Sequence, residues 1–500
     1  MTPGVMVAVV LTVLMSYVCS RISKRRRKGS KHPLSSVIFH WPDKTPFRVS
    51  DMLRSVEVKG ITGGGKSSGP GEFFARKLAA HPKATMLIIA QKPEERDDFI
   101  RIFRKAGREK DLLIVEESSA PLTCNFLQVL VKAGTDTRGI VEFLMTMVEV
   151  LEAEDGGNQS DPFWKLSQGR LLYNAIEMIT LSGEELTPEA ILEFIATAAY
   201  SQALLADKAW KAKYHNTVVG KAEARSKSGR QKGDFNLAVK YWLGEFPVLD
   251  DKPRTSIIAG VMNVLHTFNT GLVREMCSGE TKLSPSALEQ GKSILINFPI
   301  SSYGPSGRFI AGGWKYLTQK HILRRKWDPS SFFTVIVCDE FQEAVTSFDP
   351  RFLAQCRSHG GALFALTQTI HSEYGAMTGK GGNHKADSLL ANFNLHLYTT
   401  VDAKTAKFAS DLLGQRLEAI PDISEGEDPG IYQELMGKPR FRLSVKRSYQ
   451  PVLQPAVFLS GLRNGGPEND NIVDAVVIRL GNPFLCGENY QFVSFEQPKR

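Results

Sequence analysis

The pattern of apolar and polar positions divides the chain into stretches with two different periods. Short strand-like runs lie at 55–59, 85–90, 112–115, 293–298, 332–338, 362–366 and 395–398. Helix-forming stretches follow several of these runs, including 72–80, 98–107 and 309–325. Because buried parallel strands are apolar on both faces and are joined by helices, this alternation predicts an α/β fold with a parallel-sheet core.

Between the two α/β stretches, the apolar period becomes that of a helix. Apolar side chains repeat at helical spacing from Ile140 onward, and Thr187-Pro188 is typical of a helix start. After residue 425, short strand-like runs alternate with Gly, Pro and Asn turns. The predicted units are a first part of an α/β domain, an all-α insertion, a second part of that domain and a β-rich segment, at 32–139, 140–255, 256–425 and 426–500.

The N-terminus has the pattern of a membrane anchor. Residues 1–20 carry no charged side chain, and seven Lys and Arg residues follow within 21–31. The apolar run is at the short end of what spans a bilayer, and the basic residues after it predict a body in the cytoplasm. A cleaved signal peptide would carry its positive charges before the apolar run. We therefore expect residues 1–31 to be a retained, single-pass transmembrane helix with a basic juxtamembrane segment.

Composition and charge narrow the class of protein. Hydrophobic residues make up 42% and charged residues 23% of 500 positions, which is typical of a globular protein with several structural units. The six cysteines form no C-x-x-C pair, so neither a zinc site nor a disulfide framework is indicated. The net charge is +9, but the seven basic residues of 21–31 account for most of it. The overall charge alone is therefore weak support for nucleic-acid binding.

A second basic stretch lies inside the predicted insertion. Residues 208–240 contain nine Lys and Arg residues and two acidic residues, interleaved with Trp210 and Tyr214. Two interpretations remain open for this stretch: a solvated, partly disordered loop, or a patch that contacts nucleic-acid phosphates.

A glycine-rich stretch carries the clearest chemistry. Residues 60–67, Gly-Ile-Thr-Gly-Gly-Gly-Lys-Ser, fit the phosphate-binding pattern G-x-x-x-x-G-K-[ST], between a predicted strand and a predicted helix. Lys66 is expected to reach the β- and γ-phosphates, and Ser67 to bind Mg²⁺. A chance Lys-Ser beside a glycine turn is the alternative, which the flanking elements disfavour. The nucleotide-binding residues expected are Gly60, Thr62, Gly63, Gly64, Gly65, Lys66, Ser67 and Ser68.

Later strands end in residues that suit nucleotide hydrolysis. The apolar run 332–338 is followed by Asp339, expected to bind the metal, and Glu340, expected to polarise the attacking water. Gln368 ends the next strand and can touch the γ-phosphate or the water, or simply cap the strand. Arg357 lies between them and could complete a neighbouring subunit's site, because no other basic residue is expected beside the P-loop. A surface salt bridge is the alternative for Arg357.

Together these residues resemble the coupling ATPases of type IV secretion and bacterial conjugation. These are TraD- and TraG-like proteins of the FtsK/HerA class of ring-shaped DNA pumps. Besides the anchor and the two nucleotide motifs, the resemblance rests on further segments in matching order, at 92–95, 124–127, 161–164, 357–375 and 392–414. It runs through most of the chain, and the whole set is more specific than the nucleotide motifs alone.

The resemblance implies a RecA-like motor domain, an all-α domain that faces the relaxosome, and homo-hexamers in the bacterial inner membrane. It implies ATP and Mg²⁺ as cofactors, passage of single-stranded DNA, and a relaxase or relaxosome and the secretion channel as partners. One alternative is a protein-secreting ATPase of the same class without DNA affinity, which the basic residues 208–240 disfavour. Another is a membrane-tethered nucleotide-binding protein that is not a motor. Glu340 disfavours it, because a binder needs no water-activating carboxylate.

Overall fold

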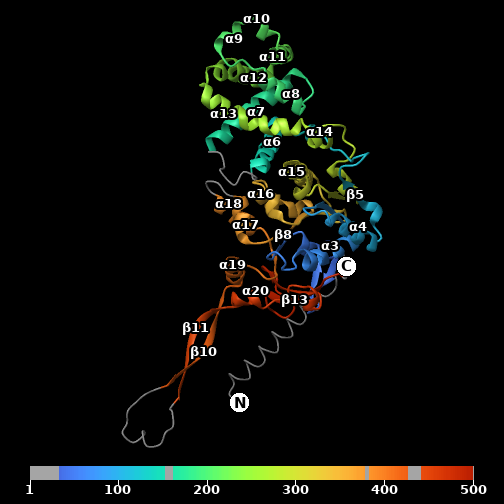
Figure 1. Ribbon diagram of the computed structural model, residues 1–500, viewed down its shortest axis with the longest axis vertical. Helices are drawn as coiled ribbons and strands as arrows, with labels where there is room; N and C mark the ends of the chain where they lie inside the picture. The colour runs from blue at the N-terminus through green and yellow to red at the C-terminus, as the bar shows by residue number, and fades with distance from the viewer. Residues whose placement is uncertain (1–32, 153–161, 378–381, 426–440, 499–500) are drawn as a thin grey trace, which may run out of the picture.

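The molecule is elongated, with a helical layer at one end, a sheet flanked by helices in the middle and a projecting hairpin at the other end (Figure 1). The computed structural model describes residues 33–152, 162–377, 382–425 and 441–498, and the anchor predicted at 1–31 lies outside them. Within these ranges, no single helix is long and apolar enough to cross a bilayer. Helices α13, Asp251–Phe268, and α14, Gly271–Cys277, are long and apolar enough only when taken together, and this pair is bent by 70°.

The centre of the molecule is a sheet of nine strands in the order β13-β12-β9-β3-β8-β7-β4-β6-β5. Seven neighbouring strands are parallel: β3 Val56–Lys59, β4 Ala84–Ile89, β5 Leu112–Val115, β6 Ser293–Ile296, β7 Phe333–Cys338, β8 Gly361–Thr367 and β9 Leu395–Tyr398. Strand β12, Ile472–Arg479, is antiparallel to both β9 and β13, Tyr490–Glu496. The predicted α/β fold is thus confirmed, and the sheet is mixed at one edge.

The strands are apolar on both faces because helices cover both faces. In β4, Met86 and Ile88 join one core with Phe74 of α3, Glu72–Ala80, and Phe103 of α4, Glu95–Lys105. Their neighbours Leu87 and Ile89 join the other core, with Trp314 and other residues of α15, Ile300–Arg324. Successive side chains of a strand point to opposite faces, so each strand supplies both cores.

A helical layer connects β5 to β6. It consists of α5 Phe126–Lys132, α6 Thr137–Glu152, α7 Pro162–Ser182, α8 Pro188–Ala196, α9 Gln202–Ala206, α10 Lys208–Lys211, α11 Tyr214–Arg225, α12 Gly229–Val239, α13 Asp251–Phe268 and α14 Gly271–Cys277. As expected at a helix start, the Thr187 side chain accepts a hydrogen bond from the Ala190 amide and caps α8. The unit boundary expected at residue 255 falls inside α13, and the first strand after the layer begins at Ser293.

The basic stretch 208–240 is helical, so its interpretation as a loop is wrong. Helices α10, α11 and α12 occupy most of it, because apolar residues such as Val218, Ala222 and Phe235 are buried against the rest of the layer. Trp210 is also buried, and its indole N–H donates to the carbonyl of Thr197. That ring is therefore not exposed for base stacking.

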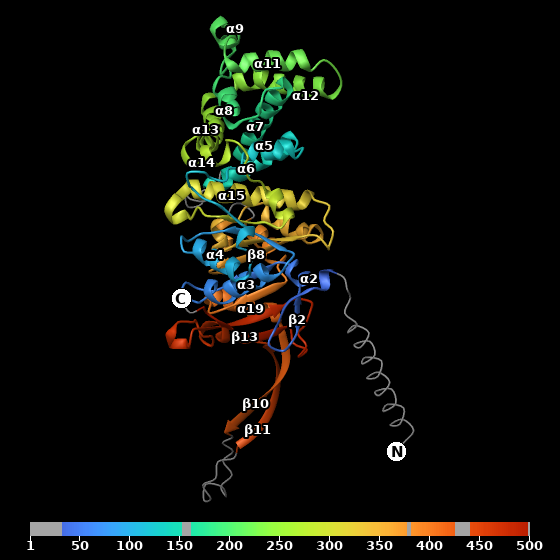
Figure 2. The ribbon, with the colours of Figure 1, turned by 90° about the vertical axis from the view of Figure 1, so that its right-hand side faces the viewer.

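The C-terminal part of the chain does not form a separate unit. Strands β12 and β13 extend the central sheet, whereas β10, Gln415–Glu425, and β11, Phe441–Pro451, form a hairpin that projects from the end opposite the helical layer (Figure 2). The remaining elements cover the sheet edges and flanks: β1 Val37–His40, β2 Pro46–Arg48, α2 Val49–Met52, α16 Asp349–Gln355, α17 Ile370–Ala376, α18 Gly382–Leu390, α19 Ala403–Leu413 and α20 Ala456–Ser460.

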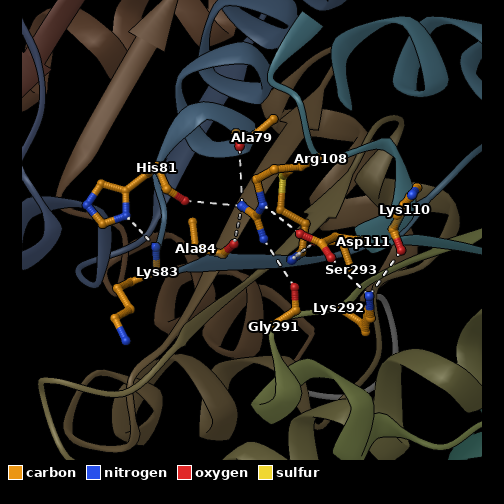
Figure 3. Close-up of polar contacts among 11 residues, drawn as sticks. Ala79, His81, Lys83, Ala84, Arg108, Lys110, Asp111, Gly291, Lys292 and Ser293 are labelled. Atoms are coloured by element: carbon orange, nitrogen blue, oxygen red, sulfur yellow. Dashed lines mark hydrogen bonds and ion pairs between the residues drawn. The ribbon is translucent and has the colours of Figure 1, made fainter. Parts of the chain in front are cut away.

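One arginine ties together the amino ends of three strands (Figure 3). Arg108 donates from Nη1 to the carbonyls of Ala79, His81 and Ala84 and from Nη2 to that of Gly291, over 2.9–3.2 Å. Its Nε also pairs with Asp111 at 3.2 Å. These contacts join the segments that lead into β4, β5 and β6, and they hold the edge of the sheet far from the glycine-rich loop.

Candidate active site

The glycine-rich loop leaves the carboxyl end of the central strand β3. Gly65 has a φ of +77°, and a Cβ there would lie 2.5 Å from Val473 of β12, so only glycine fits. Gly60 is constrained in the same way, because a Cβ would collide with the hydroxyl of Thr399. The loop then enters a short π-helical turn, Ser67–Gly71, that continues into α3. Backbone amides at this helix start are available to an anion.

The loop faces the acidic end of β7. Lys66 Nζ lies 2.9 Å from Glu340 Oε1, and the Ser67 hydroxyl donates to Asp339 Oδ2 over 2.7 Å. Gln368, after β8, donates from Nε2 to Glu340 Oε2 over 3.2 Å. Strands β3, β8 and β7 are parallel neighbours, so their carboxyl ends meet at the same edge of the sheet, where ligands bind in such folds. The structure thus brings these five sequence-predicted residues together.

Glu340 has an unusual backbone conformation, and its side chain is ionised. Its φ and ψ are 46° and 52°, in the left-handed region that costs a non-glycine residue free energy. Burial raises the pKa of Glu340, but hydrogen bonds from Gln342 and Lys66 outweigh burial and leave the pKa below its ordinary value. The group is therefore ionised near neutral pH and can accept a proton or orient a water molecule.

A second lysine lies beside the loop, contrary to the expectation that no other cation would. Lys92 Nζ is 3.3 Å from Asp339 Oδ2 and 3.5 Å from Glu340 Oε1. Burial lowers the pKa of Lys92, but the charges of Asp339 and Glu340 outweigh it and raise the pKa above its ordinary value. Lys92 follows β4, which is the neighbour of β7 only in the folded sheet, so the sequence order conceals this contact.

Glu95 completes the acidic side of this cluster. Its Oε2 accepts a hydrogen bond from the Gln91 amide over 3.1 Å. Burial, followed by the nearby charge of Asp339, raises the pKa of Glu95 well above its ordinary value. Glu95 can therefore carry a proton at a pH where Glu340 is charged, which limits the repulsion among the carboxylates.

A cavity of about 790 Å³ joins these groups and is large enough for a nucleotide. Its lining includes 61–63, 65–68, Lys92, Asp339, Glu340 and Gln368, but not Gly60 or Gly64, which act through the shape of the loop. The chain's C-terminal part also lines it: Gln497 Nε2 donates to the Ser68 hydroxyl over 2.6 Å, and Gln497 Oε1 accepts from the Gly466 amide over 2.8 Å. Nothing in the local sequence marks Gln497.

Beneath the loop, buried charges connect three strands. Lys59 and Glu57 of β3 form an ion pair with both side chains fully buried, and His396 Nδ1 of β9 lies 2.9 Å from Glu57 Oε2. Lys59 Nζ also lies 3.4 Å from Thr367 Oγ1, next to Gln368. Removing one partner would leave a buried charge unpaired, which is costly, so the network holds the root of the loop in place.

Arg357 lies away from this cavity. It is exposed in a short 3₁₀ turn, Cys356–His359, that precedes β8, so it lies at the amino end of the strands. In the part of the chain that the structure describes, its side chain forms no ion pair. It cannot reach the P-loop of its own chain, which leaves a role in a neighbouring subunit's site as an untested prediction.

The oxygen donors at the loop suit a magnesium ion that takes most of its ligands from phosphates and water. Among the described residues, no group of three or more His, Cys, Asp and Glu side chains could hold a metal. The Ser67 hydroxyl and Asp339 carboxylate are oxygen ligands, 2.7 Å apart, of the kind that Mg²⁺ prefers when phosphates supply the remainder.

Fold and site together are those of a P-loop NTPase, with one strand between the loop strand and the acidic strand. Residues 334–456 match the family model described as the TraM recognition site of TraD and TraG. No curated protein sequence matches the chain. The match and the shared fold described next confirm the resemblance to conjugative coupling proteins.

Solved structures of the conjugative coupling protein TrwB have the same fold. The unbound form has a TM-score of 0.59 at 16% identity and covers 96% of this chain and 92% of its own. TrwB with the ATP analogue ADPNP has a TM-score of 0.59 at 16% identity and covers 96% of this chain and 92% of its own. TrwB with ADP and Mg²⁺ has a TM-score of 0.58 at 17% identity and covers 95% of this chain and 92% of its own.

Proposed function

We propose that the chain is a Mg²⁺-dependent ATPase that drives single-stranded DNA, or a nucleoprotein, into a type IV secretion channel. One observation carries the enzymatic part: the P-loop residues Lys66 and Ser67 contact the strand-end carboxylates Glu340 and Asp339 inside a nucleotide-sized cavity. The TrwB structures with an ATP analogue and with ADP and Mg²⁺ support this choice of ligand.

The proposed chemistry begins with an exchange of partners. Lys66 now neutralises Glu340, and a phosphate group would compete for the same ammonium. Glu340, released from Lys66 but still contacted by Gln368, would orient the attacking water. Lys92 adds positive charge on the same side, where charge develops on the transferred phosphoryl group.

Ser67 and Asp339 are the residues that would hold Mg²⁺, which supplies charge neutralisation for the phosphates. In this structure the Ser67 hydroxyl donates its proton to Asp339. The pair is thereby already positioned as two oxygen ligands on one side of the cavity.

The transport part of the proposal rests on the family model and on the TrwB fold. The model over 334–456 is described as a TraM recognition site, which supports a relaxosome component as partner. The chain shares the fold of TrwB, a conjugative coupling protein. From the resemblance to coupling proteins we further propose a homo-hexamer, with single-stranded DNA as cargo and the secretion channel as a partner. Residues 1–31 would anchor the assembly in the inner membrane, with the ATPase body in the cytoplasm. A reporter fused after residue 31 that reads out periplasm, or a mature chain starting after Cys19, would contradict this.

The first prediction tests the enzymatic part. Lys66→Ala is expected to weaken ATP binding, whereas Glu340→Gln is expected to bind ATP and to lower kcat by about 10²–10⁴-fold, because the water loses its base. Glu343→Gln is the control, since Glu343 lies outside the cavity and pairs with Arg308. Unchanged turnover in Glu340→Gln would remove the assignment.

DNA stimulation separates the proposed motor from the two alternatives. ATP hydrolysis is measured with and without a single-stranded oligonucleotide. Stimulation supports the DNA motor. Hydrolysis without stimulation points to a protein-secreting ATPase, and ATP binding without hydrolysis points to a nucleotide-binding protein.

A further inference from the structure

A second cavity, of about 590 Å³, lies at the opposite edge of the sheet. It is enclosed by the end of α5, a 3₁₀ turn at Pro285–Gln290 and the last turn of α15. Its residue Arg325 contacts the carbonyl of Gly360, just before β8 begins. Six-residue strands such as β7 therefore separate this cavity from the nucleotide cavity by about 20 Å. The two cavities share no lining residue.

The lining of this basic cavity is strongly cationic. Lys132, Lys320, Arg324 and Arg325 oppose one carboxylate, Glu289. Glu289 is itself engaged, since its Oε1 lies 3.2 Å from His321 Nε2. Burial lowers the pKa of His321 first, and Arg325 lowers it further against the opposing effect of Glu289. Cations therefore outnumber acids even with His321 neutral.

Three of the four cations form bonds within the protein, and Arg325 and Lys320 form the shorter ones. Arg325 donates to the carbonyls of His359 and Gly360, each over 2.7 Å, and Lys320 pairs with Glu142 at 2.6 Å. These two shape the cavity and contribute to its field. Their bonds keep them from serving as the main ligands of an incoming anion.

The other two cations keep hydrogen-bond donors to spare. Among the described residues, Lys132 has no bonded partner, and Arg324 donates only through Nη1, to Thr135 Oγ1 and the Ala133 carbonyl. Ser284 and Ser286 add hydroxyls 2.7 Å from each other, and only one of the two can donate to the other. Ammonium, a guanidinium edge and hydroxyls are the donors that bind phosphate.

We propose that this basic cavity is a phosphate-binding site distinct from the nucleotide site, with Lys132 and Arg324 as its ligands. The phosphate belongs either to the backbone of single-stranded DNA or to a free phosphate compound. The site does not depend on the proposed ATPase chemistry, so either inference can fail without the other.

The test uses full-length protein and a fluorescent single-stranded oligonucleotide, with affinity measured against salt. Loss of one phosphate contact is expected to flatten the slope of log K against log salt by about 0.7. The double variant Lys132→Gln/Arg324→Gln is expected to flatten it by about 1.4. The matched control is Lys105→Gln, an exposed lysine at the end of α4 outside both cavities. Lys132→Gln decides the result if Arg324→Gln destabilises the fold through the loss of its bond to Thr135.

A second probe distinguishes the source of the phosphate. Pyrophosphate binding is measured by calorimetry in the Lys66→Ala background, which weakens phosphate binding at the nucleotide site. Weaker pyrophosphate binding in Lys132→Gln with an unchanged DNA slope assigns the site to a free phosphate compound. A flattened DNA slope assigns it to the nucleic-acid backbone. If Lys132→Gln changes neither measurement, the proposal is wrong.

Discussion

At the scale of residues, three buried lysines each form an ion pair with a carboxylate. Lys59 with Glu57, Lys315 with Asp349, and Lys66 with Glu340 are each neutralised by a close partner. An unpaired buried charge is costly, so pairing is a condition of folding. The third pair differs because it lines a nucleotide-sized cavity, where a phosphate can replace the carboxylate. A structural ion pair and a reactive one thus differ in whether a ligand can reach them, and not in residue type.

His215 makes the helical layer sensitive to acid. Its ring stacks on Phe194 with centroids 4.1 Å apart, and its Nδ1 lies 3.0 Å from the Phe194 carbonyl. Nε2 is buried without a partner, so protonation would bury an unpaired charge. Burial, opposed by the bond to Phe194, lowers the pKa of His215 from 6.5 to about 4.

The second prediction follows from that shift. The unfolded chain protonates first, so the stability due to neutral His215 is complete above pH 6.5 and is lost as pH falls to about 4. The loss is about 3 kcal/mol over this window. Thermal denaturation of His215→Phe should show a flatter pH dependence than wild type. His266→Gln, at an exposed position, is the control, and equal slopes in His215→Phe and wild type would contradict the assignment.

At the scale of elements, the glycine-rich loop is supported by a segment more than 400 positions later. Gln497, just after β13, joins the Ser68 hydroxyl to the Gly466 amide. Because the Ser68 oxygen accepts from Gln497, its own proton remains available to a phosphate oxygen. The edge of the sheet thereby positions the start of α3.

The third prediction is that Gln497→Ala raises KM for ATP by roughly two- to tenfold with little change in kcat. One lost hydrogen bond of about 0.5–1.5 kcal/mol accounts for this range, since Gln497 orients a binding group and not the reacting atoms. Gln491→Ala, on β13 but outside the cavity, should leave KM unchanged. A fall in kcat without a change in KM would indicate a different role.

The basic helices allow a sharper test of DNA binding than the sequence did. Lys221 pairs with Glu184, and Arg230 lies 3.4 Å from Asp234, so these two charges are partly neutralised. Arg225, Lys227 and Lys232 form no ion pair within the described residues. If helices α10–α12 contact single-stranded DNA, we expect each of these three side chains to contribute more than the paired Lys221 or Arg230.

The fourth prediction is therefore a change in salt dependence. Neutralising Arg225, Lys227 and Lys232 should flatten the slope of log K against log salt by about 2, at about 0.7 per contact, for every DNA sequence. Lys221→Gln should have a smaller effect, because its charge is already paired. An unchanged slope in the triple variant would make the patch a solvated surface.

At the scale of the whole molecule, the sheet separates two kinds of surface. The nucleotide cavity lies at the carboxyl ends of the parallel strands, and Arg357 lies at their amino ends. Two other arginines are paired within the chain, Arg308 with Glu343 and Arg351 with Glu142. Among the described residues Arg357 forms no ion pair, so its guanidinium would be available to the cavity of another copy in the proposed ring.

The fifth prediction tests this arrangement. Arg357→Ala should lower turnover by about 10³–10⁵ with ATP affinity close to normal, since a trans-acting arginine stabilises only the transition state. Lys66→Ala is also inactive but keeps Arg357. Mixing the two proteins should partly restore hydrolysis at interfaces that pair an intact loop with an intact arginine. If the mixture stays inactive where wild type assembles, Arg357 does not act in trans, and Arg274, Arg308 and Arg351 are next.

The sequence by itself determined the type of each main element and the chemistry at the strand ends. The uninterrupted apolar runs at 85–90 and 333–338 predict strands that are buried on both faces. The spacing of Gly60, Gly65 and Lys66 predicts a phosphate-binding loop from local sequence alone. These features depend on neighbours along the chain. They could therefore be inferred before any strand was placed in the sheet.

Only the tertiary structure decided which strands are neighbours, and therefore which side chains meet. Lys92 reaches Asp339 because β4 lies beside β7, and Gln497 reaches Ser68 because β12 and β13 return to the sheet edge. Helices α10–α12 are ordered by apolar contacts with distant helices, which the local excess of lysine and arginine conceals. The order of strands and the packing of helices depend on apolar contacts between residues far apart in the sequence. The local sequence of an element does not show which other element it will contact.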